Sequence, residues 1–234
     1  MSVLVLVLAG PLQSWGLTAR HSYRDTGAHP TKSGVIGMVA SSLGLARTDR
    51  VGLAELATLS FAVRTDQPGT RMRDFHTTHT RAGKAMPLSD RFYLADAVFA
   101  AALGGPRELL ERVRRGLCSP AHPLFLGRRS CPPARPPVHS LHPHATDPVA
   151  VLEALPWQAA DWWQAANPGQ RMVIYHDSAF ADRSAHLSPD QPLDFSPTSR
   201  RYALRPVASC TLPPAPATGP GGAPDFFDAL DDFQ

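Results

Sequence analysis

The sequence Val3-Leu4-Val5-Leu6-Val7-Leu8-Ala9, which is followed by Gly10-Pro11, predicts a buried β-strand near the start of the chain. Successive side chains of a strand point to opposite faces of its sheet, so an unbroken apolar run indicates that both faces are covered. After a polar stretch, apolar residues recur at helical spacing at Val35, Ile36, Val39 and Leu43. Thr31 or Ser33 can cap this helix.

The remaining apolar segments extend this start into a longer pattern. We expect a short helix over 53–59, a strand over 60–65, a strand over 92–101, a helix over 106–117 and a short strand over 123–126. The order is β-α-β, a long excursion, and then β-α-β. It is typical of an α+β, ferredoxin-like β-α-β-β-α-β fold, in which a four-stranded sheet carries two helices on one face. Further strands are expected over 172–175 and 201–207.

Three regions of different composition divide the chain. Residues 1–145 form the expected ferredoxin-like domain, with a polar and basic insertion at about 66–91 that can form a projecting β-hairpin. Residues 146–212 form a small, β-rich C-terminal subdomain. Residues 213–234 are rich in Pro, Gly and Ala and contain four Asp, a composition that predicts a disordered tail.

Composition excludes several classes of protein. Of the 234 residues, 43% are hydrophobic and 18% are charged, which supports a packed core and excludes wholesale disorder. The three cysteines are widely spaced, which argues against a disulfide framework or a thiolate zinc site. Reduced thiols are typical of a cytoplasmic protein, so we expect the protein in the cytoplasm. The apolar start is too short to cross a membrane.

Charge is distributed unevenly along the chain. Residues 1–145 contain 18 Lys and Arg against nine Asp and Glu, a net charge of +9, whereas residues 146–234 carry a net charge of −6. Such asymmetry suggests a polyanionic partner for the first part. The alternative is a basic surface that meets only solvent.

Two basic segments are candidates for contact with phosphates. The helix start at Pro30–Ser33 offers free N–H groups and the charge of Lys32, although it lacks the glycine that an ATP-binding P-loop needs there. Arg128 and Arg129 lie in a loop bounded by prolines, which can hold both guanidinium groups for bidentate phosphate contacts. The alternatives are an ordinary capped helix and a pair of surface charges.

The insertion combines cations with rings that can stack on bases. Its members are Arg71, Arg73, Phe75, His76, His79, Arg81 and Lys84, a combination suited to single-stranded nucleic acid, and the alternative is a solvated loop. His76 could instead act as a general acid or base with Lys84 and Tyr93 in RNA cleavage. The histidine pairs 76/79 and 142/144 lack a carboxylate or thiolate at metal-binding spacing, so neither a metal nor a cofactor is expected.

Several motifs occur in order along residues 3–135. They are Ala9-Gly10-Pro11-Leu12-Gln13-Ser14-Trp15-Gly16, Pro30-Thr31-Lys32-Ser33-Gly34-Val35-Ile36-Gly37, Phe61-Ala62-Val63-Arg64, Asp74-Phe75-His76-Thr77, Tyr93-Leu94-Ala95-Asp96-Ala97 and Leu126-Gly127-Arg128-Arg129-Ser130-Cys131-Pro132. As a set they resemble the CasD family, the "Cas-five" subunit of the type I-E CRISPR Cascade complex. The acidic tail is not part of that family pattern.

The resemblance implies a ferredoxin-like RAMP domain whose insertion at 66–91 is a thumb. It implies a subunit that grips the 5′ handle of the crRNA and contacts the last backbone subunit and the large subunit of Cascade. The thumb would lie across the duplex of guide and target DNA. The residues that we then expect to contact RNA are Arg20, Lys32, Ser33, Arg71, Arg73, Phe75, His76, Arg81, Lys84, Arg128 and Arg129.

The resemblance also bears on catalysis. In a related subtype the Cas-five subunit is itself the ribonuclease that processes crRNA precursors, whereas in type I-E a separate endonuclease does so. The resemblance therefore implies a non-catalytic binder that makes no membrane contact. Two alternatives stay open: a metal-independent endoribonuclease that uses His76, Lys84 and Tyr93, and a protein-interaction module with a basic docking face.

Overall fold

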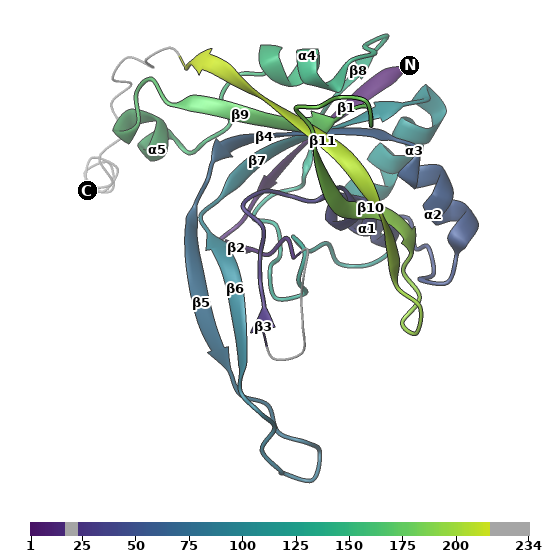
Figure 1. The fold of residues 1–234 in the computed structure, drawn as a ribbon, viewed down its shortest axis with the longest axis vertical. Helices are drawn as coiled ribbons and strands as arrows, with labels where there is room; N and C mark the ends of the chain where they lie inside the picture. The colour runs from purple at the N-terminus through teal and green to yellow at the C-terminus, as the bar shows by residue number, and fades with distance from the viewer. Residues whose placement is uncertain (17–22, 216–234) are drawn as a thin grey trace, which may run out of the picture.

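The computed structural model describes residues 1–16 and 23–215, which form a central seven-stranded sheet and a second, smaller sheet (Figure 1). The central strands are β1 (Ser2–Ala9), β4 (Ser60–Gln67), β7 (Val98–Gly105), β8 (Val138–Pro143), β9 (Arg171–Asp177), β10 (His186–Asp194) and β11 (Arg201–Pro214). They lie in the order β10, β11, β9, β4, β7, β1, β8, and each pair of neighbours is antiparallel.

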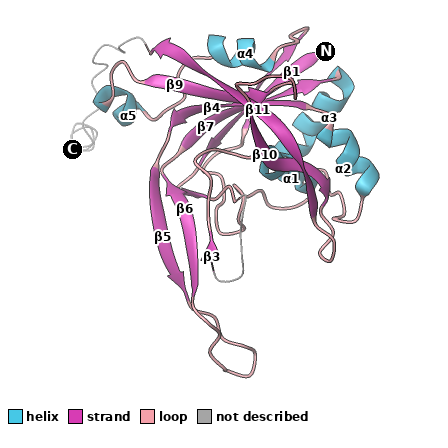
Figure 2. Ribbon diagram, viewed as in Figure 1, coloured by secondary structure: helices cyan, strands magenta, loops and turns pink. Residues whose placement is uncertain are grey.

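Helices cover both faces of the central sheet (Figure 2). On one face lie α1 (Lys32–Ser42), α2 (Arg50–Ala57) and α3 (Arg107–Cys118), which share a hydrophobic core with Leu4, Leu6 and Leu8 of β1. On the other face, α4 (Pro148–Ala154) shares a second core with Val3 and Val5, and α5 (Asp161–Ala166) follows it in the chain. The prediction that both faces of β1 are covered is therefore confirmed.

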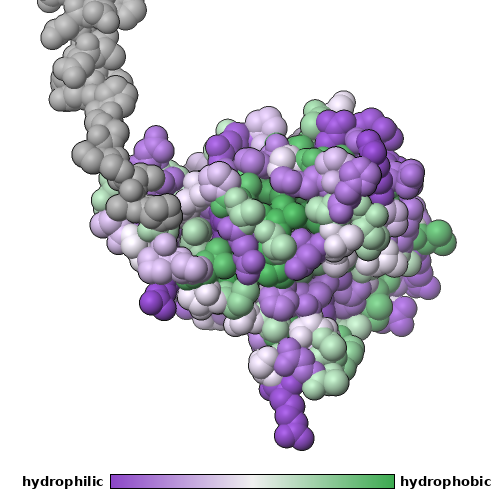
Figure 3. Space-filling view, turned by 90° about the horizontal axis from the view of Figure 1, so that it is seen from above, coloured by the Kyte–Doolittle hydropathy of each residue, from purple (hydrophilic) through white to green (hydrophobic). Residues whose placement is uncertain are grey.

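The side of the molecule that carries α4 has an apolar centre. Figure 3 looks from above onto the side that carries α4, where hydrophobic residues gather at the centre and hydrophilic residues surround them. In Figure 1 this is the side opposite to the long hairpin that projects downward.

The described chain follows the predicted order of elements through β1, α1, β4, β7 and α3, and the α+β class is confirmed. The predicted strand over 123–126 is wrong, because that segment is a loop and the next strand is β8. Six prolines between residues 119 and 137 explain this difference, since proline has no N–H to donate to a neighbouring strand.

The predicted hairpin is present and projects from the body (Figure 1). It consists of β5 (Thr70–His76), β6 (Ser89–Ala95) and the tip 77–88, and is called the thumb below. Two short strands pair with β6: β2 (Leu12–Gln13) pairs with Leu94 and Ala95 at the thumb base, and β3 (Tyr23–Arg24) pairs with Asp90 and Arg91, nearer the tip. The single strand predicted over 92–101 is wrong, because Asp96 turns the chain with a φ of 54° and separates β6 from β7.

The strands of the C-terminal region extend the central sheet. β9 and β11 contain the predicted segments 172–175 and 201–207, and β9 pairs with β4. The sequence pattern does not predict β10, because Pro189 and Pro192 interrupt it, but proline is tolerated at the edge of a sheet where β10 lies. The start of the predicted tail at residue 213 is wrong, because Pro213 and Pro214 belong to β11 and Ala215 is buried; residues 216–234 lie outside the described residues. Within the described ranges no helix is long and apolar enough to cross a membrane.

Candidate nucleic-acid interface

A cleft of about 920 Å³ lies between α1, the loop 122–132 and the tip of the β10–β11 hairpin. Helix α1 presents small residues to this cleft, among them Ser33, Gly34 and Gly37. A Cβ atom on Gly34 would lie 2.9 Å from the ring of Trp15, so internal packing requires that glycine. At Gly37, a Cβ would meet only the Phe195 ring among the described residues, at 3.7 Å. Packing therefore does not require Gly37, but its lack of a side chain widens the cleft.

Three exposed arginines surround the cleft: Arg47 after α1, Arg129 in the loop and Arg200 before β11. Within residues 1–16 and 23–215, none of their guanidinium groups forms an ion pair or a hydrogen bond. One carboxylate, that of Asp49, is present among the described lining residues, and it accepts the N–H of Gly52 at the start of α2. An unpaired positive rim of this kind attracts phosphate groups.

Aromatic rings lie beside these cations. Phe195 and Tyr202 line the cleft with their ring centroids 6.2 Å apart, and Tyr202 is 40% exposed. Phe125 lines the cleft from the loop. Exposed rings can stack on unpaired bases, so the cleft offers the two types of contact that single-stranded RNA uses.

The start of α1 differs from the open anion site that the sequence predicted. Thr31 caps the helix as expected, because its Oγ1 accepts the N–H of Gly34 at 3.1 Å. The N–H of Lys32, however, donates to the carboxylate of Asp190 in β10, at 2.8 Å. Arg205 in turn holds Asp190 through two hydrogen bonds of 2.9 and 2.8 Å. A carboxylate of the protein itself therefore occupies the place expected for a phosphate.

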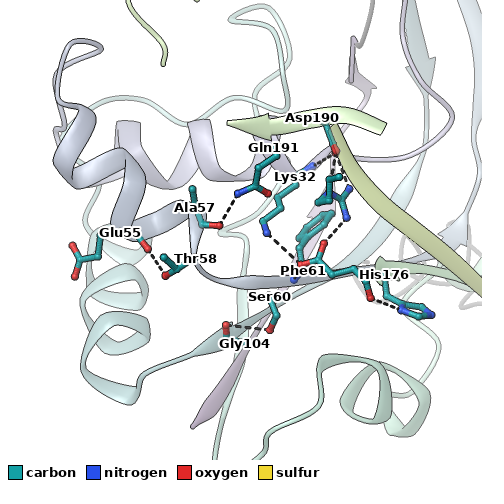
Figure 4. Close-up of polar contacts among 12 residues, drawn as sticks. Lys32, Glu55, Ala57, Thr58, Ser60, Phe61, Gly104, His176, Asp190 and Gln191 are labelled. Carbon is teal, nitrogen blue, oxygen red and sulfur yellow. Dashed lines mark hydrogen bonds and ion pairs between the residues drawn. The ribbon is translucent and has the colours of Figure 1, made fainter. Parts of the chain in front are cut away.

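Lys32 is held inside the protein rather than in the cleft. Its ammonium donates to Asp177 at 3.2 Å, and its side chain is 6% exposed. Figure 4 shows Lys32 pointing toward the region of Phe61, whose N–H also donates to Asp177. Burial lowers the pKa of Lys32, and the charge of Asp177 opposes this effect. Lys32 thus joins α1 to β9, whereas its predicted companion Ser33 lines the cleft.

On the thumb, the predicted cations are partly paired. The register of β5 and β6 places Arg71, Arg73 and Phe75 on one face. Arg71 pairs with Asp25 at 2.7 Å and Arg73 with Asp90 at 3.1 Å. Phe75 is 61% exposed, and the guanidinium of Arg73 lies 4.2 Å from its ring centroid. Arg81 and Lys84 are exposed in the tip, so the thumb offers one open ring and two open cations.

The three side chains of the nuclease hypothesis are not brought together. His76 lies opposite Ser89, and Tyr93 lies four residues further along β6, about 13 Å away at the usual rise of a strand. Tyr93 is buried, with the guanidinium of Arg128 4.8 Å from its ring centroid. Lys84 lies in the tip, beyond the paired strands. The described structure therefore does not assemble an acid–base group from these residues.

The adjacent arginines of the loop have different surroundings. Arg128 donates to the backbone carbonyls of Phe92 at 3.0 Å and Arg24 at 2.7 Å. Arg129 is exposed at the cleft. Of these two predicted RNA contacts, Arg129 is the one whose guanidinium is free to meet a phosphate, and the predicted contact Arg20 lies outside the described residues.

Sequence reasoning missed Arg47 and Arg200 as candidate RNA contacts. Each is far from Arg129 in the chain, and folding brings all three to the same cleft. The tract Arg200-Arg201-Tyr202 carries a usable signal, because two cations precede an aromatic residue. Arg47 stands in a short polar turn without such a signal.

The first sequence motif maintains the fold beneath the cleft. The side-chain amide of Gln13 donates to the carbonyls of Leu8 at 3.0 Å and Ala97 at 2.7 Å. The indole of Trp15 donates to Gln13 at 3.0 Å, and the side chain is 1% exposed. These residues join β1, the thumb base and α1 into one frame.

No metal centre is formed by the described side chains. Across residues 1–16 and 23–215, no three His, Cys, Asp or Glu side chains lie close enough to hold a metal ion.

Comparison with known proteins identifies the family of this fold. The family model of the CRISPR-associated protein Cas_Cas5 matches residues 3–208. The chain belongs to the Cas5 family. It is 34% identical over 154 residues to the CRISPR system Cascade subunit CasD of Escherichia coli (strain K12), a match that spans 58% of this chain and 69% of that protein. The predicted resemblance to CasD is therefore confirmed.

Two solved structures share the fold of this Cas5 chain. One, described as a crystal structure of a Cas protein, is 32% identical with a TM-score of 0.71, over 93% of this chain and 100% of that one. The other belongs to a CRISPR RNA-guided surveillance complex and is also 32% identical, with a TM-score of 0.74 over 98% of both chains.

Proposed function

We propose that this Cas5 chain is a non-catalytic, RNA-binding subunit of a CRISPR Cascade surveillance complex and that it holds the 5′ handle of the crRNA in the cleft. The observation that carries the proposal is a rim of three exposed arginines, Arg47, Arg129 and Arg200, which form no ion pair within residues 1–16 and 23–215 and lie around a cleft with the exposed ring of Tyr202. The similarity to CasD of Cascade and to a chain of an RNA-guided surveillance complex supports it.

The physical argument rests on the two parts of an RNA contact. Guanidinium groups bind phosphates in bidentate fashion, which gives affinity that depends strongly on salt. A ring such as Tyr202 adds stacking on a base, worth about 1–3 kcal/mol per base. The small residues of α1 let the RNA backbone approach the floor of the cleft. Together these contacts favour a single strand with splayed bases over a regular duplex.

The proposal includes a finer description of the fold and of the partners. The spatial order β8, β1, β7, β4, with α1 and α3 on one face, supports a ferredoxin-like RAMP unit at the centre of the chain. We place the last backbone subunit and the large subunit of Cascade beside it, in the cytoplasm. The thumb, with Phe75, Arg81 and Lys84 open, would lie across the duplex of guide and target DNA. Sequence recognition of the target would then belong to base pairing.

The separation of His76, Lys84 and Tyr93 supports a role without catalysis. An endoribonuclease of the kind considered from the sequence needs an acid and a base close to one scissile phosphate. The test of binding below also reads cleavage, so it distinguishes the two functions directly.

The experiment is a binding titration of labelled repeat RNA, without metal and at several salt concentrations. The variant combines Arg47→Gln, Arg129→Gln and Arg200→Gln. The matched control combines Arg107→Gln, Arg115→Gln and Arg171→Gln, three exposed arginines outside the cleft lining that remove the same charge. We expect the cleft variant to flatten the dependence of log affinity on log salt by roughly three, about one per lost phosphate contact, and the control to keep the parental slope.

Two results would contradict the proposal. Equal loss of affinity in both variants would mean that overall charge, and not the cleft, holds the RNA. A single-site cut in the RNA, read on a sequencing gel and lost in His76→Ala, would make the protein a nuclease.

A further inference from the structure

We infer that Arg128 is a positioning residue that sets the angle of the thumb relative to the cleft, and that its neighbour Arg129 makes the RNA contact. The part that concerns Arg129 rests on the proposed function. The part that concerns Arg128 rests on the geometry of the free protein and can be tested without RNA.

The loop 126–131, which carries both arginines, is held by backbone hydrogen bonds and packs closely against Ser14. The N–H of Leu126 donates to the carbonyl of Cys131 at 2.7 Å, and the N–H of Cys131 donates to the carbonyl of Arg128 at 2.9 Å. At Gly127, where φ is 85°, a Cβ atom would lie 1.7 Å from the carbonyl oxygen of Ser14. Only glycine fits this approach, so the loop backbone is held close to Ser14 immediately before Arg128.

Arg128 uses its guanidinium to connect separate segments of the thumb base. Nη1 donates to the carbonyl of Phe92 in β6, and Nη2 donates to the carbonyl of Arg24 in β3, with a longer contact of 3.4 Å to the carbonyl of Asp25. The same group lies over the ring of Tyr93. A planar guanidinium can reach two acceptors at once with fixed geometry, whereas the ammonium of lysine cannot. Backbone carbonyls therefore accept from both Nη atoms of Arg128.

Other contacts also hold the thumb against the body: Gln13 Nε2 donates to the carbonyl of Ala97, the N–H of Asp96 donates to the carbonyl of Pro11, and Arg71 pairs with Asp25. The strands β2 and β3, which pair with β6, contain two residues each. The ring of Phe92 packs against Tyr23 with centroids 5.0 Å apart, and Ser14 Oγ donates to the carbonyl of Phe92 at 3.2 Å. From Phe92 to the tip is about nine residues, or roughly 30 Å, so a tilt of about 10° at the base would move the tip by about 5 Å. A small change of tilt at the Arg128 contacts would therefore be magnified at the tip.

Arg129 points to the other side of the same loop. It lines the cleft, and within the described ranges its guanidinium is not bound to another group of the protein. One rigid loop thus holds the thumb through Arg128 and meets the cleft through Arg129. RNA bound at Arg129 would find the thumb already aligned, which lowers the cost of ordering it on binding.

The experiment measures the distance between two spin labels on the free protein. The labels are carried by Ala82→Cys in the tip and Glu108→Cys on α3, in a background with Cys118→Ser and Cys210→Ser. The variants are Arg128→Ala, Arg128→Lys and, as the matched neighbour, Arg129→Ala. Thermal unfolding checks that each variant folds, and Arg128→Lys keeps the charge in case the alanine variant does not.

We expect Arg128→Ala and Arg128→Lys to broaden or shift the distance distribution, and Arg129→Ala to leave it as in the parent. In the salt titration with repeat RNA, we expect Arg129→Ala to lower the slope by about one and Arg128→Lys to leave it unchanged. A parental distance distribution in both Arg128 variants would overturn the positioning role. If the distances change as expected but none of the proteins binds RNA, the positioning role stands and the proposed function fails.

Discussion

Replacement of Gly37 by Ala should separate the stability of the protein from its affinity for RNA. Gly37 lies inside α1, and a Cβ there would be 3.7 Å from the Phe195 ring, an ordinary van der Waals contact. Glycine in the middle of a helix costs about 0.5–1 kcal/mol relative to alanine, so we expect the free energy of unfolding of G37A to rise by about that amount. For a chain of this size the melting temperature should rise by roughly 1–4 °C.

The same methyl group should weaken RNA binding, because it enters the cleft where α1 otherwise has no side chain. Forcing an extra methyl group into a close contact costs about 1–3 kcal/mol, which corresponds to a loss of roughly 5- to 160-fold in affinity. Thermal unfolding and a filter-binding titration with handle RNA measure the two effects. Gly34→Ala is the control, because its Cβ would lie 2.9 Å from Trp15 and should lower stability. A G37A protein that is more stable and binds RNA as tightly as the parent would refute this reasoning.

Three further predictions concern charge. Arg47→Gln and Arg200→Gln should each lower the slope of log affinity for RNA against log salt concentration by about one. An unchanged slope in a salt titration would mean that the substituted residue does not contact RNA phosphates. Asp190→Asn should lower the free energy of unfolding by about 1–3 kcal/mol in urea denaturation, because it removes one of the two carboxylates that pair with buried Arg205, the other being that of Asp177. An unchanged free energy of unfolding would contradict the importance of this pair. Burial opposes ionisation of Asp190, but Arg205 and the N–H of Lys32 outweigh burial and hold the pKa of this carboxyl below its ordinary value. The ionised carboxylate therefore stabilises the fold above about pH 4, and this stabilisation should be lost as the pH falls further. The Asp190→Asn variant should lose less stability over the same range. Burial lowers the pKa of His29, which stacks on Tyr175 with centroids 4.0 Å apart, so protonation favours the unfolded chain. Stability should fall as the pH drops from about 7 to 5, and His29→Phe, which keeps the stack, should flatten this part of the pH profile.

Local patterns were enough to predict much of the fold. The apolar run of β1, the helical spacing in α1 and the basic insertion each carry their signal within a few neighbouring residues. The elements that failed depend on distant ones. Residues 123–126 are apolar enough for a strand, but the partner edge beside β1 is taken by β8, after the last of six prolines. β10 contains two prolines and is possible only because it lies at the edge of the sheet.

The candidate site was harder to predict for the same reason. The cap at Thr31 was correctly expected, but the carboxylate that takes the N–H of Lys32 lies 158 residues away, in Asp190. Arg128 and Arg129 are adjacent and of the same type, so the sequence does not distinguish their roles. Only the fold shows that the guanidinium of Arg128 donates to the backbone carbonyls of Phe92 and Arg24. Arg47 and Arg200 could not be recognised as neighbours without the cleft that they share.

The most direct test of the account is to map where the RNA lies on the protein. Repeat RNA with 4-thiouridine in the handle is crosslinked by light to the protein within the reconstituted complex, and the crosslinked peptides are identified by mass spectrometry. The account predicts crosslinks in residues 122–131 and 195–202, the two segments that face each other across the cleft. Crosslinks confined to α4 or to the edge strand β8, on the other side of the molecule, would contradict it.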